Sequence, residues 1–403
     1  MAIELGRFLA STTGAGSPSC SVYDRIVPGD IEHPDALQHH RIRGRGAGIN
    51  PPNRFDGVRL SVLGEFLDEQ AAEYPEGVQV PTTVYEDRTK SVLNRVDSPD
   101  LPFRWTVNPY RGCEHGCVYC YARPGHEMLG FSLGLDFETK IAAKTGAPAL
   151  LAAALDKPAW AGETVVMSGV TDPYQPIERR LRITRACLEV MAARAQPVAI
   201  VTKNALVLRD IDLLRELSSH GACRVYVSVT SLDPHTARAM EPRASSPASR
   251  LRAIRELTDA GVPTGVMTAP IIPGLNDHEM PALLKAAHEA GARSAGWVLL
   301  RLPHQIKDVF FDWARREFPD RAKRIEHAVR ETREGELYDA AFFTRQRGTG
   351  ERAEHMQRTF EVFTRRLGMN KDRVALSTAE FERRRAALRL RGGDTGQRLL
   401  FGE

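Results

Sequence analysis

Long apolar runs, a hydrophobic leader, a large net charge and abundant cysteine are all missing from this 403-residue sequence. No window approaches the roughly 18 consecutive apolar residues of a membrane span, so we expect none. The N-terminal MAIELGRFLASTTGAGS has no basic segment followed by an apolar stretch, which argues against a secretory signal and for a cytoplasmic location. The net charge of +4 permits an anionic partner without requiring one. Six cysteines in so long a chain are too few for a disulfide scaffold.

The remaining composition is that of a globular protein, and the chain divides into three expected parts. Residues 1–103 contain the Gly/Pro-rich runs STTGAGSPSC and RIRGRGAGINPPNRF, and we expect an irregular N-terminal arm there. Residues 305–403 are charged and helical in pattern. Their basic tail, ERRRAALRLRGGDTG, predicts a helix that ends at Gly392, with either a solvated face or a nucleic-acid contact.

Between residues 104 and 304, apolar β-branched runs alternate with helical patterns. Three helices are expected to end at glycine, each with a strand close behind it: at Gly221, Gly261 and Gly291. Val207, Ile211 and Leu214 share one face of an expected helix. Strand–helix–strand units of this length predict a parallel α/β sheet, which periodicity alone leaves as doubly wound or barrel-like. The expected strands begin at Thr164, Val198, Arg224, Gly265 and Gly296.

Three cysteines fall within eight residues, in the segment NPYRGCEHGCVYCYARPGHE. Cys113, Cys117 and Cys120 have the spacing C-x3-C-x2-C, which allows a tight loop to direct three thiolates at one centre. Iron–sulfur clusters use such thiolates, and three of them leave one iron of a cubane open. The alternative is a zinc site with His115 or His126 as the fourth ligand. Cys187 and Cys223 lie in apolar patterns and are expected in the core.

The cysteine motif, with the aromatic Tyr119 just before its last cysteine, resembles the radical S-adenosylmethionine superfamily over residues 104 to 302. The resemblance implies an open, partial (β/α)6 TIM-like barrel and an enzyme that holds a 4Fe-4S cluster. It also implies a reducing electron donor of the flavodoxin or ferredoxin type. In that family the cluster splits S-adenosyl-L-methionine and yields a 5′-deoxyadenosyl radical, which abstracts hydrogen from the substrate.

The stretches from Cys113 to Tyr121, SGVTDPYQPIE and VTK look like the spore photoproduct lyase branch. The segments RGAGINPPNRF and LNRVDSPDLPFRWTVNPYRGCEHGC resemble an uncharacterised bacterial offshoot of it. The resemblance assigns the metal to the three cysteines and the hydrogen relay to Tyr119 and Tyr121. It assigns cofactor binding to Tyr119, Thr171, Lys203, Ser228 and, within APIIPGLND, the backbone around Ile272.

One position departs from the lyase pattern: Gly169 stands where that family has the cysteine that returns hydrogen to the product. Repair of thymine dimers is therefore not expected. Nucleic acid remains the favoured substrate class, because of the nearest family and of basic tracts at His40–Arg45, Arg243–Arg255 and Arg383–Arg391. The alternatives are radical modification of a protein or small molecule, and a zinc-stabilised binding module without chemistry.

Overall fold

The computed structural model describes residues 42–55, 79–167, 169–371 and 375–398. Its main sheet has the strand order β10-β9-β8-β7-β6-β3-β2. From β10 through β3, each strand is parallel to its neighbours. At the edge of the sheet, β2 pairs with β3 in the antiparallel sense. This is the partial (β/α)6 arrangement, and the expectation of an open barrel rather than a doubly wound sheet is confirmed. The strands span Leu93–Arg95 (β2), Trp105–Val107 (β3), Val165–Met167 (β6), Val198–Thr202 (β7), Cys223–Ser228 (β8), Thr264–Ile271 (β9) and Ser294–Leu299 (β10).

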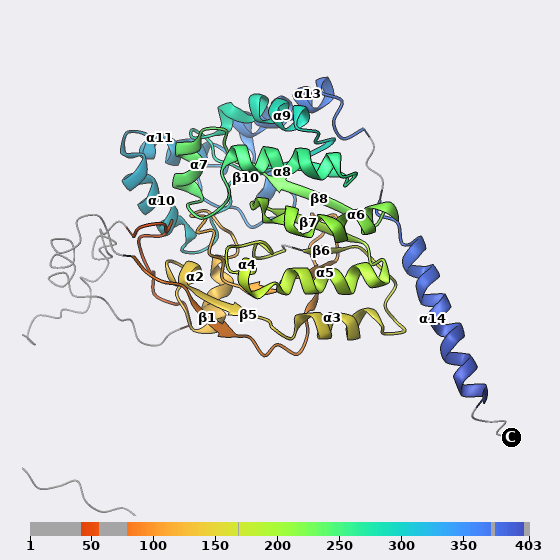
Figure 1. Ribbon diagram of the computed structural model, residues 1–403. Helices are drawn as coiled ribbons and strands as arrows, with labels where there is room; N and C mark the ends of the chain where they lie inside the picture. The colour runs from red at the N-terminus through yellow and green to blue at the C-terminus, as the bar shows by residue number, and fades with distance from the viewer. Residues whose placement is uncertain (1–41, 56–78, 168, 372–374, 399–403) are drawn as a thin grey trace, which may run out of the picture.

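Helices follow the parallel strands and lie around the outside of the sheet (Figure 1). The parallel strands are rich in Val and Ile and are largely buried, as expected for strands covered on both faces. The helices of this layer are α3 (Ala147–Leu155), α4 (Glu178–Leu181), α5 (Ile183–Arg194), α6 (Ile211–Ser219), α7 (Pro234–Met240), α8 (Pro247–Asp259) and α9 (Met280–Glu289), with 3-10 turns η3 (Ala205–Asp210) and η4 (Asp277–Glu279).

The expected glycine stops are confirmed. Gly221, Gly261 and Gly291 follow the ends of α6, α8 and α9 with positive φ angles of 66°, 80° and 109°. The left-handed conformation turns the chain back toward the sheet, and a strand begins within a few residues. The expected helix through Val207 and Leu214 is instead two elements, because the chain passes from the 3-10 turn η3 into α6 at Ile211. Both Val207 and Leu214 are nevertheless buried.

A second, three-stranded sheet has the order β1-β5-β4 and carries the chain into the cysteine segment. Its strands are Thr83–Glu86 (β1), Tyr110–Arg111 (β4) and Lys140–Ala143 (β5), and the helix α2 (Asp136–Thr139) precedes β5. Both β1 and β2 lie within the expected irregular arm; β1 pairs with the distant β5, whereas β2 pairs with β3 across a short connection. Residues 1–41 and 56–78 of that arm lie outside the described residues, and the domain boundaries at 103 and 304 stay predictions.

The C-terminal part is helical, with α10 (Ile306–Glu317), α11 (Pro319–Glu331), α12 (Thr344–Arg347), α13 (Gly350–Arg366) and α14 (Ala379–Arg398). The helix α14 runs on to Arg398, so the expected stop at Gly392 is wrong. The first turns of α14 contact α5, and the rest of the helix projects away from the barrel (Figure 1). In the described part of the chain, no helix is long and apolar enough to cross a membrane.

Candidate active site

The three clustered cysteines lie in a loop between β4 and the 3-10 helix η2 (Arg123–Leu129), just beyond the end of the first parallel strand, β3. Cys113 and Cys117 are buried, Cys120 is partly buried, and all three are free thiols. The loop backbone is tied at both ends, since Cys113 N donates to Phe137 O (2.8 Å) and Val118 N donates to Met240 O (3.3 Å). The loop is therefore held in place by contacts of the protein itself.

A buried ion pair supports this loop from beneath. Arg123 and Glu138, whose side chains are fully buried, meet at 2.6 Å, and Arg123 also donates to Cys117 O at 2.8 Å. Glu138 accepts hydrogen bonds from the arm backbone at Gly46 N (2.9 Å) and Ala47 N (2.8 Å). A Cβ at Gly46 would lie 2.0 Å from Gly116 O, so only glycine permits this approach of the arm to the cysteine loop.

The three thiols fit a cluster that supplies positive charge. Burial raises the pKa of Cys117 well above its ordinary value, with Glu241 adding to the effect while Lys203 opposes it. Burial, followed by Cys113, raises the pKa of Cys120 to about 11. Thiolates are the metal-binding form, and an iron centre would offset this cost. Within the described ranges, no three His, Cys, Asp or Glu side chains gather as around a single metal ion.

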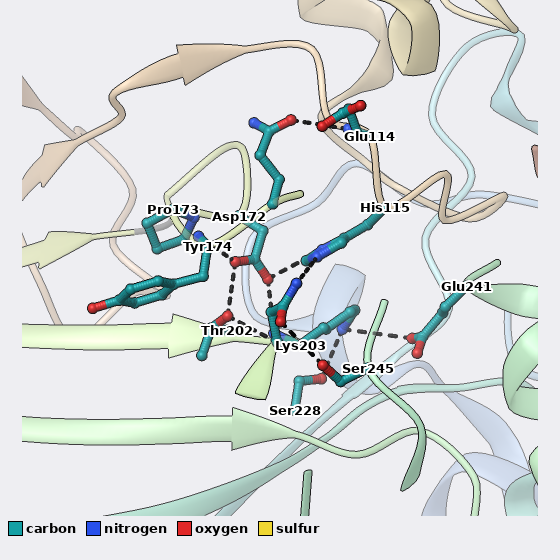
Figure 2. A network of polar contacts seen from close by, with 12 residues as sticks. Glu114, His115, Asp172, Pro173, Tyr174, Thr202, Lys203, Ser228, Glu241 and Ser245 are labelled. Carbon is teal, nitrogen blue, oxygen red and sulfur yellow. Dashed lines mark hydrogen bonds and ion pairs between the residues drawn. The ribbon is translucent and has the colours of Figure 1, made fainter. Parts of the chain in front are cut away.

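Lys203, at the end of β7, and Ser228, at the end of β8, meet in front of this loop. Lys203 Nζ donates to Ser228 Oγ at 2.7 Å and to Ala269 O, on β9, at 3.2 Å (Figure 2). It also lies 5.9 Å from the centre of the Tyr119 ring. The structure therefore brings together Tyr119, Lys203 and Ser228, because the carboxyl ends of parallel strands converge at one face.

Glu241, which sequence reasoning missed, joins this group from the loop after α7. Its buried carboxylate accepts hydrogen bonds from Tyr119 Oη and Arg250, and from Thr230 Oγ1 at 2.9 Å, with Lys203 Nζ at 3.8 Å. Burial acts to raise the pKa of Glu241, but Arg250 and then Lys203 outweigh it, and the pKa is lowered. An ionised Glu241 thus fixes the hydroxyl of Tyr119 and balances the charge of Arg250.

Asp172 forms a second missed network, on the other side of Lys203 (Figure 2). Its Oδ1 accepts from Thr202 Oγ1 (2.8 Å) and its Oδ2 from the Lys203 amide (2.7 Å), while His115 Nδ1 lies at 3.4 Å from Oδ2. Burial acts to lower the pKa of His115, but Asp172 and then Cys113 raise it to about 10. The contact ties the cysteine loop to the ends of two strands.

Neither histidine of the zinc alternative is placed as a simple fourth ligand. His115 is occupied by Asp172 and by Asn204, whose Nδ2 lies 3.1 Å from His115 Nε2. His126 packs against the rings of Phe131 and Phe137. Burial lowers the pKa of His126 to about 4, in keeping with this apolar setting.

Thr171 and Ile272 are near the group but are engaged locally. Thr171 Oγ1 donates to Tyr110 O at 2.9 Å, and its neighbour Asp172 makes the contact with Lys203 instead. The Ile272 amide donates to Asn276 Oδ1 at 2.6 Å. The side chain of Ile272 belongs to the same apolar cluster as Tyr119 and Cys117.

The outer rim of the barrel mouth carries Tyr121, whose hydroxyl donates to Gly169 O at 2.8 Å. Gly169 follows β6, near the first edge of the parallel sheet. Arg301 follows β10, at the last edge, and its guanidinium lies 5.3 Å from the Tyr121 ring centre. Tyr121 therefore bridges the two edges of the sheet. The sequence carried no signal for these contacts, because Tyr121, Gly169 and Arg301 are far apart in the chain.

Many arginines of the three basic tracts are engaged within the molecule rather than gathered on one surface. Ion pairs and hydrogen bonds to backbone oxygen account for Arg45, Arg243, Arg250, Arg252, Arg383, Arg384 and Arg385. Pairing within the chain weakens the tracts as evidence for a nucleic-acid surface, most clearly for the buried Arg250.

Similar proteins identify the family. The Radical SAM superfamily model matches residues 107–287. An uncharacterised protein of Mycobacterium tuberculosis is 38% identical over 251 residues, which are 62% of this chain and 74% of that protein. An uncharacterised protein of Methanocaldococcus jannaschii is 31% identical over 192 residues, 48% of this chain and 69% of that protein. A spore photoproduct lyase structure with bound AdoMet and dinucleoside spore photoproduct shares the fold, with a TM-score of 0.51 and 15% identity over 76% of this chain and 93% of that one. The chain belongs to the radical S-adenosylmethionine superfamily and is an enzyme of that superfamily.

Proposed function

We propose that Cys113, Cys117 and Cys120 ligate a 4Fe-4S cluster and that the barrel mouth binds S-adenosyl-L-methionine beside it. When bound, the cluster supplies the electron that cleaves S-adenosyl-L-methionine to methionine and a 5′-deoxyadenosyl radical. The observation that carries the proposal is the placement of three free thiols, two buried and one partly buried, in one loop directly in front of Lys203 and Ser228.

The residues around the thiols have distinct proposed tasks. Lys203 and Ser228 provide an ammonium and a hydroxyl for the methionine carboxylate, and the 2.7 Å bond between them already holds both groups at one point. Tyr119, oriented by Glu241, packs near the adenine together with the Ile272 side chain. Thr171 supports the methionine end from the β4 side, where its hydroxyl meets Tyr110 O.

Tyr121 stands apart from this group, because its ring is half exposed and faces the rim. We place it between the cofactor and the substrate, in a relay of hydrogen atoms with Tyr119. Cys120 separates the two tyrosines by a single position, so both phenols depend on the same short loop. The substrate would enter from the exposed side of Tyr121.

Nucleic acid is the proposed substrate class. Spore photoproduct lyase, which shares the fold, is known with a bound dinucleoside, and this supports the class without identifying the substrate. The second candidate is radical modification of a protein or small molecule, whereas the binding module without chemistry is set aside by the enzyme family. A flavodoxin or ferredoxin type of reductant and a cytoplasmic location complete the proposal.

The test is anaerobic reconstitution with iron and sulfide, followed by reduction and quantification of 5′-deoxyadenosine formed from S-adenosyl-L-methionine. Formation of 5′-deoxyadenosine that requires all three cysteines supports the proposal. A reconstituted protein that holds iron but releases no 5′-deoxyadenosine under strong reduction contradicts it.

A further inference from the structure

Two arginines near the carboxyl end of β10 form no close ion pair with a carboxylate among the described residues, although Asp339 lies near enough to Arg333 to favour its charged form. Arg301 contacts the Tyr121 ring, and its buried Nε has no hydrogen-bond partner among these residues. Arg333 is only 3% exposed, and its Nε is likewise buried without a partner in the described part of the chain. Such orphaned donors are costly in a folded protein and call for a ligand or a strong structural reason.

Hydrogen bonds to the backbone satisfy only some of the donors of Arg333. Arg333 donates to three backbone oxygens, those of Leu300, Thr344 and Arg345, at 2.8–3.0 Å. Burial lowers the pKa of Arg333 to about 10, with Asp339 opposing and Arg301 adding to the decrease. Arg301 is therefore close enough to repel Arg333, and an anion beside Arg301 would relieve this repulsion.

The position of Arg301 suits a ligand that enters the barrel. Its guanidinium stands over Tyr121, which is 48% exposed and whose hydroxyl reaches Gly169 at the opposite edge of the mouth. Val170, next to Gly169, is 45% exposed and extends the apolar surface. A guanidinium beside an exposed aromatic face is a combination that binds a phosphate and stacks the attached base.

We propose that Arg301, with Arg333 behind it and Tyr121 alongside, binds a phosphodiester group of a nucleic-acid substrate at the rim of the barrel. This rests on the proposed function, because it takes the barrel mouth to be the place of catalysis. The planar fork of arginine matches two phosphate oxygens, and the Tyr121 face receives the neighbouring base. The rim then orients the substrate toward the cysteine loop, one residue from Tyr121.

The test measures binding without chemistry, on the full reconstituted chain. A fluorescein-labelled oligothymidylate is titrated by anisotropy against wild type, Arg301→Ala and Arg301→Lys. We expect Arg301→Ala to weaken binding roughly 10-fold or more and to reduce the slope of log K against log salt concentration by about 0.7, the value for one phosphate contact on a single strand. Arg301→Lys keeps the charge but not the fork and should keep the slope while losing part of the affinity.

Matched controls separate this role from folding and from the proposed function. Arg321→Ala removes the same charge from an exposed position on α11 and should leave binding unchanged. Iron content should be the same in wild type and Arg301→Ala, which would show that the cysteine loop is intact in the variant. If the wild type forms no 5′-deoxyadenosine but the binding difference persists, the proposed chemistry fails and the phosphate site stands.

Three results would overturn the inference. The first is equal affinity and equal salt slope for wild type and Arg301→Ala. The second is an Arg301-dependent affinity for a labelled glutamate-rich peptide with none for oligothymidylate, which would assign the rim to a protein carboxylate. The third concerns uncharged links. An oligothymidylate with uncharged methylphosphonate links should bind wild type and Arg301→Ala equally, and a persistent difference would also contradict the phosphate assignment.

Discussion

The inner wall and the outer rim of the barrel mouth differ in how their polar groups are satisfied. On the inner wall, the buried Glu241 carboxylate contacts Tyr119, Arg250 and Thr230, and it also faces Lys203 (the last contact in Figure 2). On the rim, Tyr121 makes one hydrogen bond to a backbone oxygen, and Arg301 Nε has no partner in the described residues.

This difference suits two kinds of ligand. A buried, fully bonded network keeps one geometry, because each broken bond leaves a charge or dipole in a medium of low dielectric constant. Such a wall fits a cofactor that is the same in every turnover. The exposed rim costs little to rearrange and leaves charge available, which fits the substrate side of the site.

The largest expected effect is on the loop that the inner wall faces. Cys113→Ala, Cys117→Ala and Cys120→Ala should each lose the cluster, because a cubane needs all three thiolates, and 5′-deoxyadenosine formation should fall to background. Iron and sulfide analysis of anaerobically purified protein measures this, with about four of each expected in wild type.

Cys187→Ala and Cys223→Ala are the matched controls. Both thiols are fully buried in the hydrophobic core, in α5 and β8. Replacing either of them should leave the iron content unchanged. Full iron content in the variant lacking all three loop cysteines would disprove the cluster assignment.

The next prediction tests how much the buried contacts of Glu241 on the inner wall contribute to stability. Glu241→Ala removes the partner of Arg250, whose side chain is 1% exposed, and leaves a buried unpaired charge. We expect the free energy of unfolding to fall by about 3–5 kcal/mol, measured by chemical denaturation. Glu354→Ala removes the exposed partner of Arg358 on α13 and should cost no more than about 0.5 kcal/mol. Equal losses for the two variants would show that the inner wall is no more tightly coupled than the surface.

Lys203→Ala should affect the cofactor rather than the fold. Loss of a charge-assisted hydrogen bond at this partly buried site costs about 1.5–3 kcal/mol of S-adenosyl-L-methionine binding, roughly 10- to 150-fold in affinity. Equilibrium dialysis with labelled S-adenosyl-L-methionine measures it, and iron content should be normal. Lys285→Ala, at an exposed position on α9, is the control. Affinity equal to wild type would exclude Lys203 from the binding site.

The smallest expected effect concerns the rim at Gly169. The resemblance to the lyase places the hydrogen-donating cysteine here, and glycine has no weak S–H bond to offer. We therefore expect no multiple-turnover repair of dinucleotide spore photoproduct by wild type, measured as thymidylyl-thymidine formed. Efficient repair by wild type would contradict this.

The structure shows that the variant that would restore the cysteine, Gly169→Cys, needs a second substitution. A Cβ at Gly169 would lie 2.7 Å from Thr106 Cγ2, so Gly169→Cys alone is crowded. Gly169→Cys combined with Thr106→Ser removes that methyl group and is the better test of gained repair. Gain in the double variant and not in Thr106→Ser alone would show that the missing thiol limits the reaction.

Much of the scaffold could be predicted from local signals. Buried β-branched runs gave five of the parallel strands, and Gly221, Gly261 and Gly291 marked helix ends because a left-handed residue is needed there whatever surrounds it. The short strands β1 and β2 were missed, because four and three residues are too few to show a strand period, and β1 also depends on its distant partner β5.

The candidate site also has a part that could be predicted from the sequence and a part that could not. The spacing of Cys113, Cys117 and Cys120 by itself pointed to a shared metal centre, because three thiols within eight residues can be directed at one point by a tight loop. Glu241, Asp172 and Arg301 carry no local signal, since each has a site partner that is distant in the chain: Tyr119, Lys203 and Tyr121 respectively. Only the tertiary structure decided which charges are paired inside and which are left at the rim, because burial and the convergence of strand ends are properties of the folded chain.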